Sequence, residues 1–181
     1  RTPALPRLRS LALTDNGQVS ADGVAALAAS PRMAGLKALD VSGNDVGDAG
    51  ARAVADPRHL PRLHTFRVHN NHIGDAGAAA LAGSPLLARM LARNPRLDLR
   101  QNAIGPAGAA ALAAAPTLAA AAALDLSGNY LGDAGVTAVA FSPHLAKLRR
   151  LQVRQNGITD DGAVTLAHSP LMPRLGHLDV S

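Results

Sequence analysis

The sequence predicts a single α/β solenoid, a right-handed coil of short strands and helices with a parallel inner sheet and outer helices. The prediction depends on six copies of the phrase Leu-x-x-Leu-x-Leu-x-x-Asn, whose closing asparagines are 28, 27, 31, 27 and 27 residues apart. These are Asn16, Asn44, Asn71, Asn102, Asn129 and Asn156. Each copy continues with a segment rich in glycine and alanine that ends at a proline, most clearly from Ile73 to Pro85. One strand phrase and one helix phrase per period are typical of stacked repeats.

A short strand opens each repeat. In the segment from Leu36 to Ser42, alternation with period two sends Leu39 and Val41 into the core, so the side chains between them face outward from the inner sheet. Parallel stacking at about 4.8 Å per strand then predicts three outward-facing columns. The columns are Ser10, Ala38, Thr65, Arg96, Ala123, Arg150 and His177; Ala12, Asp40, Arg67, Asp98, Asp125, Gln152 and Asp179; and Thr14, Ser42, His69, Arg100, Ser127, Arg154 and Ser181.

A turn and a helix follow each strand. Pairs such as Gly47-Asp48 recur at one aligned position and indicate an N-cap followed by the first helical residue. The expected N-caps are Ser20, Gly47, Gly74, Gly105, Gly132 and Thr159. A second aligned glycine, such as Gly77, is expected to let the helix lie close to the sheet. Each helix should end after two to three turns, because proline disfavours the helical conformation in the residue before it. These ends are Ser30-Pro31, Asp56-Pro57, Ser84-Pro85, Ala115-Pro116, Ser142-Pro143 and Ser169-Pro170.

The polar residues of the repeat have structural explanations. The amides of the closing asparagines are expected to satisfy backbone groups that the turns leave unpaired, with one repeat bonding toward the next. His64, His69 and His72 invite a metal hypothesis, but the sequence has no cysteine, and His69 belongs to a strand while His72 belongs to a turn. A solvated surface is favoured for all three. The repeated Gly-Asp-Ala-Gly lacks the Gly-Lys-Ser/Thr of a phosphate loop, so no cofactor is expected.

Composition favours a reducing, cytoplasmic compartment. The 181 residues include no cysteine, no charged-then-apolar leader and no Asn-x-Ser/Thr sequon. The segment from Ala107 to Leu124 has 18 residues without a charge, which approaches the length of a membrane span. It nevertheless keeps the repeat register and contains Gly108 and Pro116, so it is predicted to be a helix, a loop and a strand.

Both ends of the chain interrupt a repeat. The segment from Thr2 to Leu8 copies that from Ser169 to Leu175, and the last strand phrase, from Leu175 to Ser181, lacks its turn and helix. Terminal repeats of a solenoid need a polar cap, and neither end supplies one. The sequence therefore predicts a single array over 1–181, with about six repeats and partial repeats at both ends, within a longer protein.

Charge is distributed unevenly around the repeat. All 13 acidic residues are aspartates, and eight lie in a turn or at a helix start, whereas eleven of the 18 basic residues lie in a return loop or at a strand start. The favoured interpretation is that each charge complements a helix end, contributing about 0.3 to 1 kcal/mol. A nucleic-acid partner on the basic edge is disfavoured, because Phe66, Tyr130 and Phe141 cannot form a platform on which bases stack.

One repeat is longer than the others. Twelve residues separate the helix-ending Pro85 from the next central strand leucine, whereas eight do so after Pro143, so four residues are inserted on the basic edge. The segment from Leu86 to Arg93 can extend as a helix with Arg89 and Arg93 four residues apart. These two arginines form a secondary candidate binding site, while a tolerated surface loop is the alternative explanation.

The repeat phrase also carries a family resemblance. Leu-Asp-Leu-Ser-Gly-Asn from Leu124 to Asn129, followed by Leu-Gly-Asp-Ala-Gly, resembles the ribonuclease-inhibitor type of leucine-rich repeat. That type is shared by the inhibitor, Ran GTPase-activating proteins and nucleotide-oligomerisation receptors. The resemblance implies a curved α/β horseshoe whose inner sheet and adjoining turns bind protein. The chain lacks the inhibitor's cysteines, and no position matches a motif of the GTPase activators.

Together these features predict a non-catalytic scaffold that binds a protein partner through the concave sheet and adjoining turns. The candidate contact residues are Asp40, Arg67, His69, Arg96, Asp98, Arg100, Asp125, Arg150, Gln152 and Arg154. Regulation of an enzyme, such as a GTPase, is the alternative. Catalysis by the chain is disfavoured, because no nucleophile–base pair or carboxylate dyad stands outside the repeat register. Arg67 between Asp40 and Asp98 is expected to form an ion-pair ladder across the strands.

Overall fold

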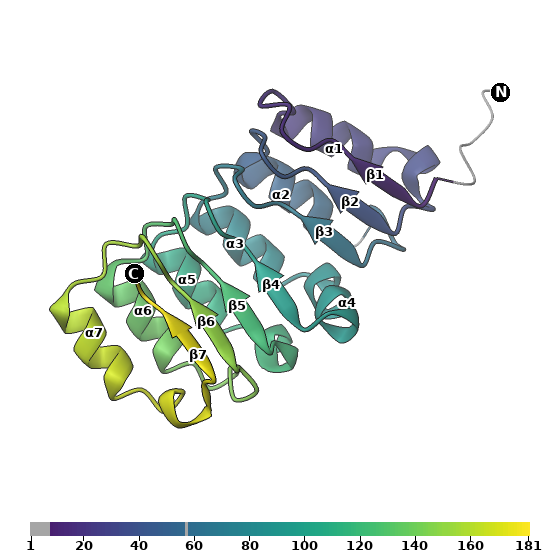
Figure 1. Ribbon diagram of the computed structural model, residues 1–181. Helices are drawn as coiled ribbons and strands as arrows, with labels where there is room; N and C mark the ends of the chain where they lie inside the picture. The colour runs from purple at the N-terminus through teal and green to yellow at the C-terminus, as the bar shows by residue number, and fades with distance from the viewer. Residues whose placement is uncertain (1–7, 57) are drawn as a thin grey trace.

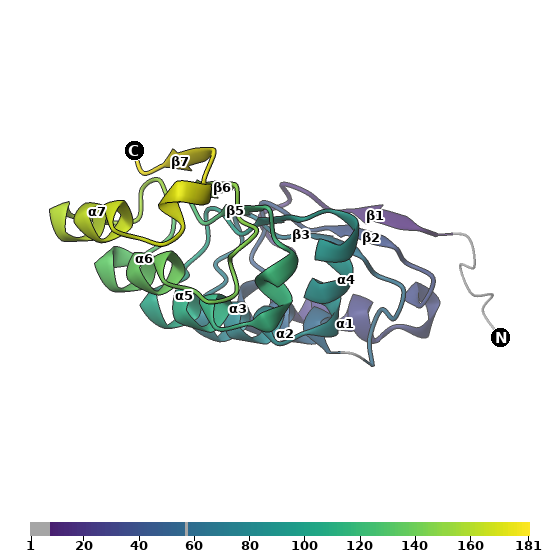
Figure 2. The ribbon, with the colours of Figure 1, turned by 90° about the horizontal axis from the view of Figure 1, so that it is seen from below.

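The chain folds as a two-layer solenoid in which parallel strands form one face and helices form the other (Figures 1 and 2). This computed structural model describes residues 8–56 and 58–181. The predicted partial repeat at the front begins within residues 1–7 and so lies outside the described residues. The predicted α/β repeat fold is confirmed. We call the exposed surface of the strands the sheet face.

Each repeat contributes one short strand and one helix of about two turns. The strands are β1 (Ser10–Ala12), β2 (Ala38–Asp40), β3 (Thr65–Arg67), β4 (Arg96–Asp98), β5 (Ala123–Asp125), β6 (Arg150–Gln152) and β7 (His177–Asp179). The repeat helices are α1 (Ala21–Ala29), α2 (Gly47–Ala55), α3 (Asp75–Ala82), α5 (Pro106–Ala113), α6 (Gly132–Ala140) and α7 (Asp160–Ala167). An additional helix, α4 (Pro85–Arg93), and the 3₁₀ helices η1 (Pro31–Met33), η2 (Pro116–Ala120) and η3 (Met172–Arg174) lie in the return segments. Every repeat helix ends two or three residues before its proline, as predicted.

The strand register is the predicted one, but the sheet is divided. β1, β2 and β3 form one parallel sheet and β4 to β7 form another, so no strand pairing joins β3 to β4 in the part of the chain that the structure describes. Within each sheet the outward columns align, for example Asp40 beside Arg67 and Arg96 beside Ala123. The predicted continuous columns across all seven strands are therefore wrong at one place, between Arg67 and Asp98.

The division coincides with the inserted residues. The segment predicted to extend as a helix does so as α4, and its leucines Leu86, Leu87 and Leu91 are buried. Figure 1 shows α4 standing beside β4 at the edge where the strands begin. Asn94, which takes the place of a buried aliphatic residue such as Leu63, is exposed at the end of α4. Helix α4 therefore replaces the tight return loop that brings other strands into pairing distance.

The core is a ribbon of aliphatic side chains between the two layers. The central strand residues Leu39, Leu97, Leu124 and Leu151 are at most 5% exposed, as the alternation predicts. Ser42 departs from the prediction, because it is buried, at 2% exposure, and its hydroxyl contacts Nδ1 of His69 at 3.0 Å. At the equivalent positions Thr14, Arg100 and Arg154 are exposed, so the alternation otherwise continues to the start of the turn.

The closing asparagines join the repeats at their turns. Nδ2 of Asn44 donates to the carbonyl of Leu13 in the preceding repeat at 2.7 Å, and its Oδ1 accepts from the N–H of Val19 at 3.3 Å. The same pattern recurs at Asn71, Asn102, Asn129 and Asn156, all at most 7% exposed. Each amide thus satisfies buried backbone groups of two repeats, which confirms the structural interpretation.

Aspartates at the helix starts join the outer layer in a similar way. Oδ1 of Asp48 accepts hydrogen bonds from the backbone N–H groups of Gly74, at 2.7 Å, and Gly77, at 2.8 Å. Asp75 and Asp133 make equivalent bonds to the start of the following helix. A carboxylate of one repeat therefore caps the helix of the next, where unpaired N–H groups and the positive end of the helix dipole meet.

This cap adds a second reason for the second glycine of the phrase. A Cβ at Gly77 would lie 2.6 Å from Oδ1 of Asp48, and one at Gly108 would lie 2.6 Å from Oδ1 of Asp75. The missing side chain makes room for the neighbouring repeat's carboxylate and also for the close packing of the turn, since the same Cβ at Gly77 would lie 2.7 Å from Cγ2 of Ile73. The Thr159 hydroxyl, which also bonds Asp133, lowers the pKa of that carboxyl, with help from the Thr159 backbone.

The caps also explain two corrections at the helix starts. Gly74, Gly105 and Thr159 are N-caps, as predicted, and all are extended, with φ between −96° and −101°. At Gly47 and Gly132 φ is instead 55° and 56°, and the N-caps are Val46 and Leu131. The preceding repeats hold Ala21 and Pro106 where the others hold aspartate. Without a carboxylate to accept its N–H, the glycine adopts the left-handed conformation.

The uncharged stretch from Ala107 to Leu124 has the predicted structure. It contains most of α5, then η2 and the start of β5, each in repeat register. None of the helices among the described residues is both long and apolar enough to cross a membrane.

We predict that Asp48→Ala lowers the free energy of unfolding by about 1 kcal/mol, the usual cost of removing a helix cap. Asp160→Ala is the matched control: Asp160 occupies the same repeat position, but no further repeat α-helix follows α7 among the described residues, so the change should be within about 0.5 kcal/mol. Urea unfolding followed by circular dichroism measures both. Equal losses would show that the helix dipole, rather than the bond between repeats, accounts for the effect of Asp48.

Gly132→Ala should destabilise the chain by about 1 kcal/mol, because alanine is strained in the left-handed conformation. Nothing lies within 4 Å of a Cβ built there, so the cost reports on the backbone alone. Gly74→Ala, at the aligned extended position, should cost less. Pro106→Asp tests whether the missing carboxylate is the cause of the left-handed conformation. The free-energy cost of Gly132→Ala, measured by the same unfolding experiment, should be smaller in the Pro106→Asp background. An equal cost in both backgrounds contradicts the proposed role of the aspartate.

Candidate functional site

A cleft opens on the sheet face where the sheet is divided. We call it the break cleft; its volume is about 300 Å³. It is lined by His64, Thr65, Phe66, Arg67, His69, Met90, Asn94, Arg96, Asp98 and Arg100. The lining comes from β3, the end of α4, and β4 with its following turn. Five of the ten predicted contact residues meet here: Arg67, His69, Arg96, Asp98 and Arg100.

The cleft is open toward the return segments and closed at the turns. Across the division the turn bonds persist: the N–H of Asn70 donates to the carbonyl of Arg100 at 3.1 Å, and Nδ2 of Asn102 donates to the carbonyl of Val68 at 3.2 Å. The strands themselves are unpaired along their facing edges in the described chain. The cleft is therefore a wedge, closed at one end by asparagine bonds and opened at the other by α4.

An apolar space adjoins the break cleft. It shares Phe66, Met90 and Asp98 with the cleft. Its remaining lining is Val68, Leu81, Leu87, Leu97 and Leu99. Met90 lies between the two and is only partly buried. Because methionine is unbranched and adapts its shape readily, this position suits the floor of a binding cleft.

The predicted ion-pair ladder is interrupted at the break. Arg67 pairs with Asp40 on the neighbouring strand, with Nη1 3.5 Å from Oδ2, but Asp98 pairs with Arg100 of its own repeat at 3.6 Å. Arg67 does not reach Asp98 because β3 and β4 are not adjacent strands of one sheet. The arginine side chains are 64% and 45% exposed, so each pair contributes little to stability and both guanidinium groups can contact a partner.

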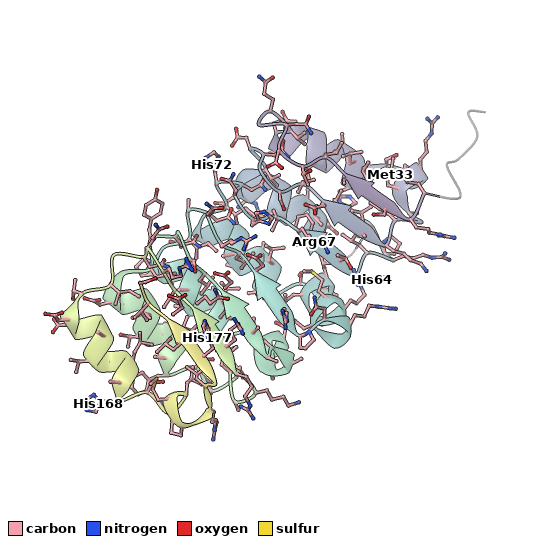
Figure 3. All side chains as sticks on the ribbon, in the orientation of Figure 1. Met33, His64, Arg67, His72, His168 and His177 are labelled. Carbon is pink, nitrogen blue, oxygen red and sulfur yellow. The ribbon has the colours of Figure 1, made fainter. Side chains whose placement is uncertain are left out.

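A second cleft lies beside the first, on the edge where the strands begin. We call it the edge cleft; it has a volume of about 640 Å³ and is lined by Lys37, Pro61, Arg62, His64, Arg89, Ala92 and Arg93. His64 belongs to both clefts, and Figure 3 shows it near α4, on the same side of the molecule as Arg67. Burial, with the positive charges of Arg93 and Lys37, lowers the pKa of His64. His64 is therefore neutral at pH 7.

The two arginines of the secondary candidate site differ in role. Nε of Arg89 donates to the carbonyl of Leu63 at 3.0 Å and the side chain is partly buried, so it ties α4 to the preceding repeat. Arg93 is exposed at the end of α4. Both line the edge cleft, but Arg93 has the greater freedom to contact a partner.

The other predicted contact residues lie on the sheet face outside the break cleft. Asp40 is on β2, where Oδ1 accepts from the N–H of Ser42 at 3.1 Å in addition to the Arg67 pair. Asp125 lies on β5, and Arg150 and Gln152 lie on β6. Arg154 pairs with Asp179, with 3.4 Å between Nη1 and Oδ2. The structure therefore arranges the predicted residues as one cluster at the break, Asp40 beside it on β2, and a row along β5, β6 and the turn after β6.

Sequence reasoning missed part of the lining. His64, Met90, Lys37 and Arg62 were not among the predicted contact residues, although all lie within or beside the long return segment. The four inserted residues were the available signal. A return segment that lengthens must displace its neighbours, and the residues beside it become the walls of the opening.

The histidines do not converge. Nδ1 of His69 contacts the Ser42 hydroxyl, whereas Nδ1 of His72 lies 3.1 Å from Oδ1 of Asp45 in the turn, and Figure 3 shows His72 and His64 at opposite edges. No group of three or more potential metal ligands occurs within residues 8–56 and 58–181. The Ser42 and His69 pair has a buried hydroxyl, so it orients the ring rather than presenting a nucleophile.

Comparison with known proteins agrees with this architecture. The family profile described as Leucine Rich repeat matches residues 5–28, 36–55, 59–82, 96–113, 123–140 and 144–167, which is more than half of the chain. The chain is thus an array of the repeat class that the fold defines, and it belongs to the leucine-rich repeat family. Proteins of this family commonly mediate protein–protein interaction. No protein of curated function matches the sequence.

Solved structures with a similar fold include two repeat proteins. One is an internalin, InlF, from Listeria monocytogenes, at 20% identity and a TM-score of 0.38, with 98% of this chain and 62% of that chain covered. The other is the ectodomain of the plant membrane receptor kinase GASSHO1/SCHENGEN3 from Arabidopsis thaliana, solved in complex with CASPARIAN STRIP INTEGRITY FACTOR 2, at 13% identity and a TM-score of 0.36. That alignment covers 97% of this chain and 27% of the receptor, so the chain spans less than two thirds of either protein.

We predict that Arg89→Ala lowers the free energy of unfolding by about 1 kcal/mol, through the lost hydrogen bond and side-chain packing. Arg93→Ala should leave stability unchanged within about 0.5 kcal/mol, since its side chain is exposed. The two substituted residues lie one turn apart on the same helix. Thermal unfolding of both variants measures the difference in stability. A loss at Arg93 as large as that at Arg89 would contradict the assigned roles.

Proposed function

We propose that this chain is a non-catalytic protein-binding scaffold whose principal contact surface is the sheet face around the break cleft. The observation that carries the proposal is the concentration there of exposed arginines over an apolar floor. Buried apolar contacts with arginines around them are typical of the residues that dominate protein–protein affinity. The row along β5, β6 and the turn after β6, with Asp125, Arg150, Gln152 and Arg154, extends this surface.

The repeat phrase supports a narrower assignment. We infer that the array is of the ribonuclease-inhibitor-like type, since each repeat of 27 or 28 residues carries a full α-helix on the outer layer. Regulation of a partner enzyme, as that resemblance suggests, would use the same surface. A turnover assay with candidate GTPases would separate the two functions: acceleration supports regulation, and unchanged turnover supports simple binding.

The partner is to be identified by photo-crosslinking in the source cells. A benzoyl-phenylalanine is placed at Gln152, on the sheet face, or at Arg52, exposed on α2 in the helix layer. We expect one dominant adduct from Gln152 and none from Arg52. Adducts formed only from the helix layer would overturn the proposal, because they would place the contact surface on the opposite face.

Affinity for the purified partner then tests the residues. The triple variant Arg67→Ala, Arg100→Ala, Arg154→Ala should weaken binding at least tenfold, about 1.4 kcal/mol, by removing three exposed guanidinium groups from the sheet face. Arg52→Ala is the control and should bind as the unmodified chain does. Calorimetry measures each dissociation constant. An unchanged affinity in the triple variant rejects the sheet face as the contact surface.

A further inference from the structure

The break cleft and the edge cleft adjoin, and together they form a depression whose two parts share His64 as a lining residue. Helix α4 supplies lining residues to each, with Met90 in the break cleft and Arg93 in the edge cleft. The depression therefore runs from the sheet face around the edge where the strands begin, which is the path of an extended segment rather than of a compact ligand.

The charge of this depression is one-sided. Seven lysine and arginine side chains line the two clefts, and Asp98 is the one carboxylate among the described lining residues. Asp98 already pairs with Arg100, at 3.6 Å. Lys37, Arg62, Arg93 and Arg96 are exposed and make no ion pair with a described residue. Their charges are uncompensated within the chain, so an occupant that supplies carboxylates is favoured.

The apolar lining of the break cleft and the unpaired edges of β3 and β4 set two further requirements for the occupant. Phe66 and Met90 line the break cleft, whose volume of about 300 Å³ has room for one large aliphatic side chain of the occupant. The facing edges of β3 and β4 are not paired with any described strand, so their backbone groups are available to an extended main chain. A polypeptide satisfies both requirements, since it has a main chain that can pair and side chains of either kind.

We propose that the joined clefts bind an acidic peptide segment of the partner, with one large aliphatic side chain entering the break cleft and flanking carboxylates contacting Lys37, Arg62, Arg93 and Arg96. This rests on the proposed function and names the chemistry of the partner's contact segment. A nucleic-acid strand fits less well, because Phe66 is the one Phe, Tyr or Trp of the described lining and is 5% exposed, so it offers bases no stacking surface.

Defined peptides test the proposal with the purified 181-residue chain. Fluorescence anisotropy compares a heptapeptide of glutamates with a central leucine, the same peptide with a central alanine, a lysine counterpart, and an oligothymidylate of equal charge. The leucine peptide should bind about tenfold more tightly than the alanine peptide, which reflects burial of the larger side chain. Both glutamate peptides should weaken as salt rises, and the lysine peptide should not bind.

Two variants locate the site. Arg62→Glu with Arg93→Glu should weaken the leucine peptide at least tenfold, whereas Arg52→Glu with Arg174→Glu, which changes net charge equally but lines neither cleft, should not. Met90→Ala should reduce the preference for leucine over alanine. The thermal unfolding temperatures of all variants are compared, and the charge variants alter only exposed side chains.

Three results would overturn the inference: equal affinity for the leucine and alanine peptides, equal weakening by both charge variants, or tighter binding of the oligothymidylate. None of them would affect the crosslinking test. A partner that crosslinks to Gln152 but shows no dependence on Arg62 and Arg93 would leave the scaffold function standing and reject the acidic segment. Binding of the acidic peptide without a crosslink from Gln152 would keep the break cleft as a contact surface and reject its extension along β5 and β6.

Discussion

The structure depends on the satisfaction of buried backbone groups at the turns between repeats. Each turn leaves N–H and C=O groups inside the stack, where leaving one unpaired costs about 1 to 3 kcal/mol. The asparagine amide meets this requirement because it offers donors and an acceptor on one short side chain. Asn71 is fully buried, donates to the carbonyl of Val41 at 2.9 Å and accepts from the N–H of Val46 at 3.2 Å, both in the preceding repeat. The fixed position of asparagine in the phrase follows from this bond, and the stacking of the strands follows from the turns that it holds together.

The outer layer is coupled less uniformly, and its variation shows how one repeat determines the conformation of the next. Where the first helical residue is aspartate, its carboxylate bonds the following helix and holds the residue at its start extended, as at Gly74. Where that residue is Ala21 or Pro106, the corresponding glycine is left-handed. The same local sequence, Gly-Asp-Ala-Gly, therefore has two conformations at Gly74 and Gly132, and the difference lies 26 residues earlier in the chain. The sequence of a single repeat does not contain this difference in conformation, because the interaction that decides it joins two neighbouring repeats.

Much of the fold was predictable because periodicity reports directly on burial. The spacing of Leu39 and its equivalents fixed the strands, their order and their register, and the prolines fixed the helix ends. The inserted helix was also foreseen, but its effect on the sheet was not. Leu86, Leu87 and Leu91 of α4 enter the core, and the packing that they require separates β3 from β4. Sequence spacing shows that a segment is longer, whereas the displacement of its neighbours depends on three-dimensional packing. For the same reason His64 and Met90 escaped prediction, while Arg67 and Arg96 were found from their strand positions.

The departure from periodicity also changes the electrostatics of the sheet face. Between β2 and β3 the register brings a cation beside an acid, Arg67 beside Asp40, and the two charges offset each other. Two such charges about 4 Å apart at a protein surface attract with about 1 to 4 kcal/mol before solvation and entropy are considered. At the break this pairing is impossible, because Arg67 and Asp98 belong to separate sheets. The same insertion that opens the wedge therefore leaves Arg67 without an acid on the side of β4 and places Met90 of α4 in the cleft lining. A regular repeat would have closed the gap and brought Asp98 beside Arg67, so the irregular repeat provides shape, apolar contact and exposed positive charge in one place.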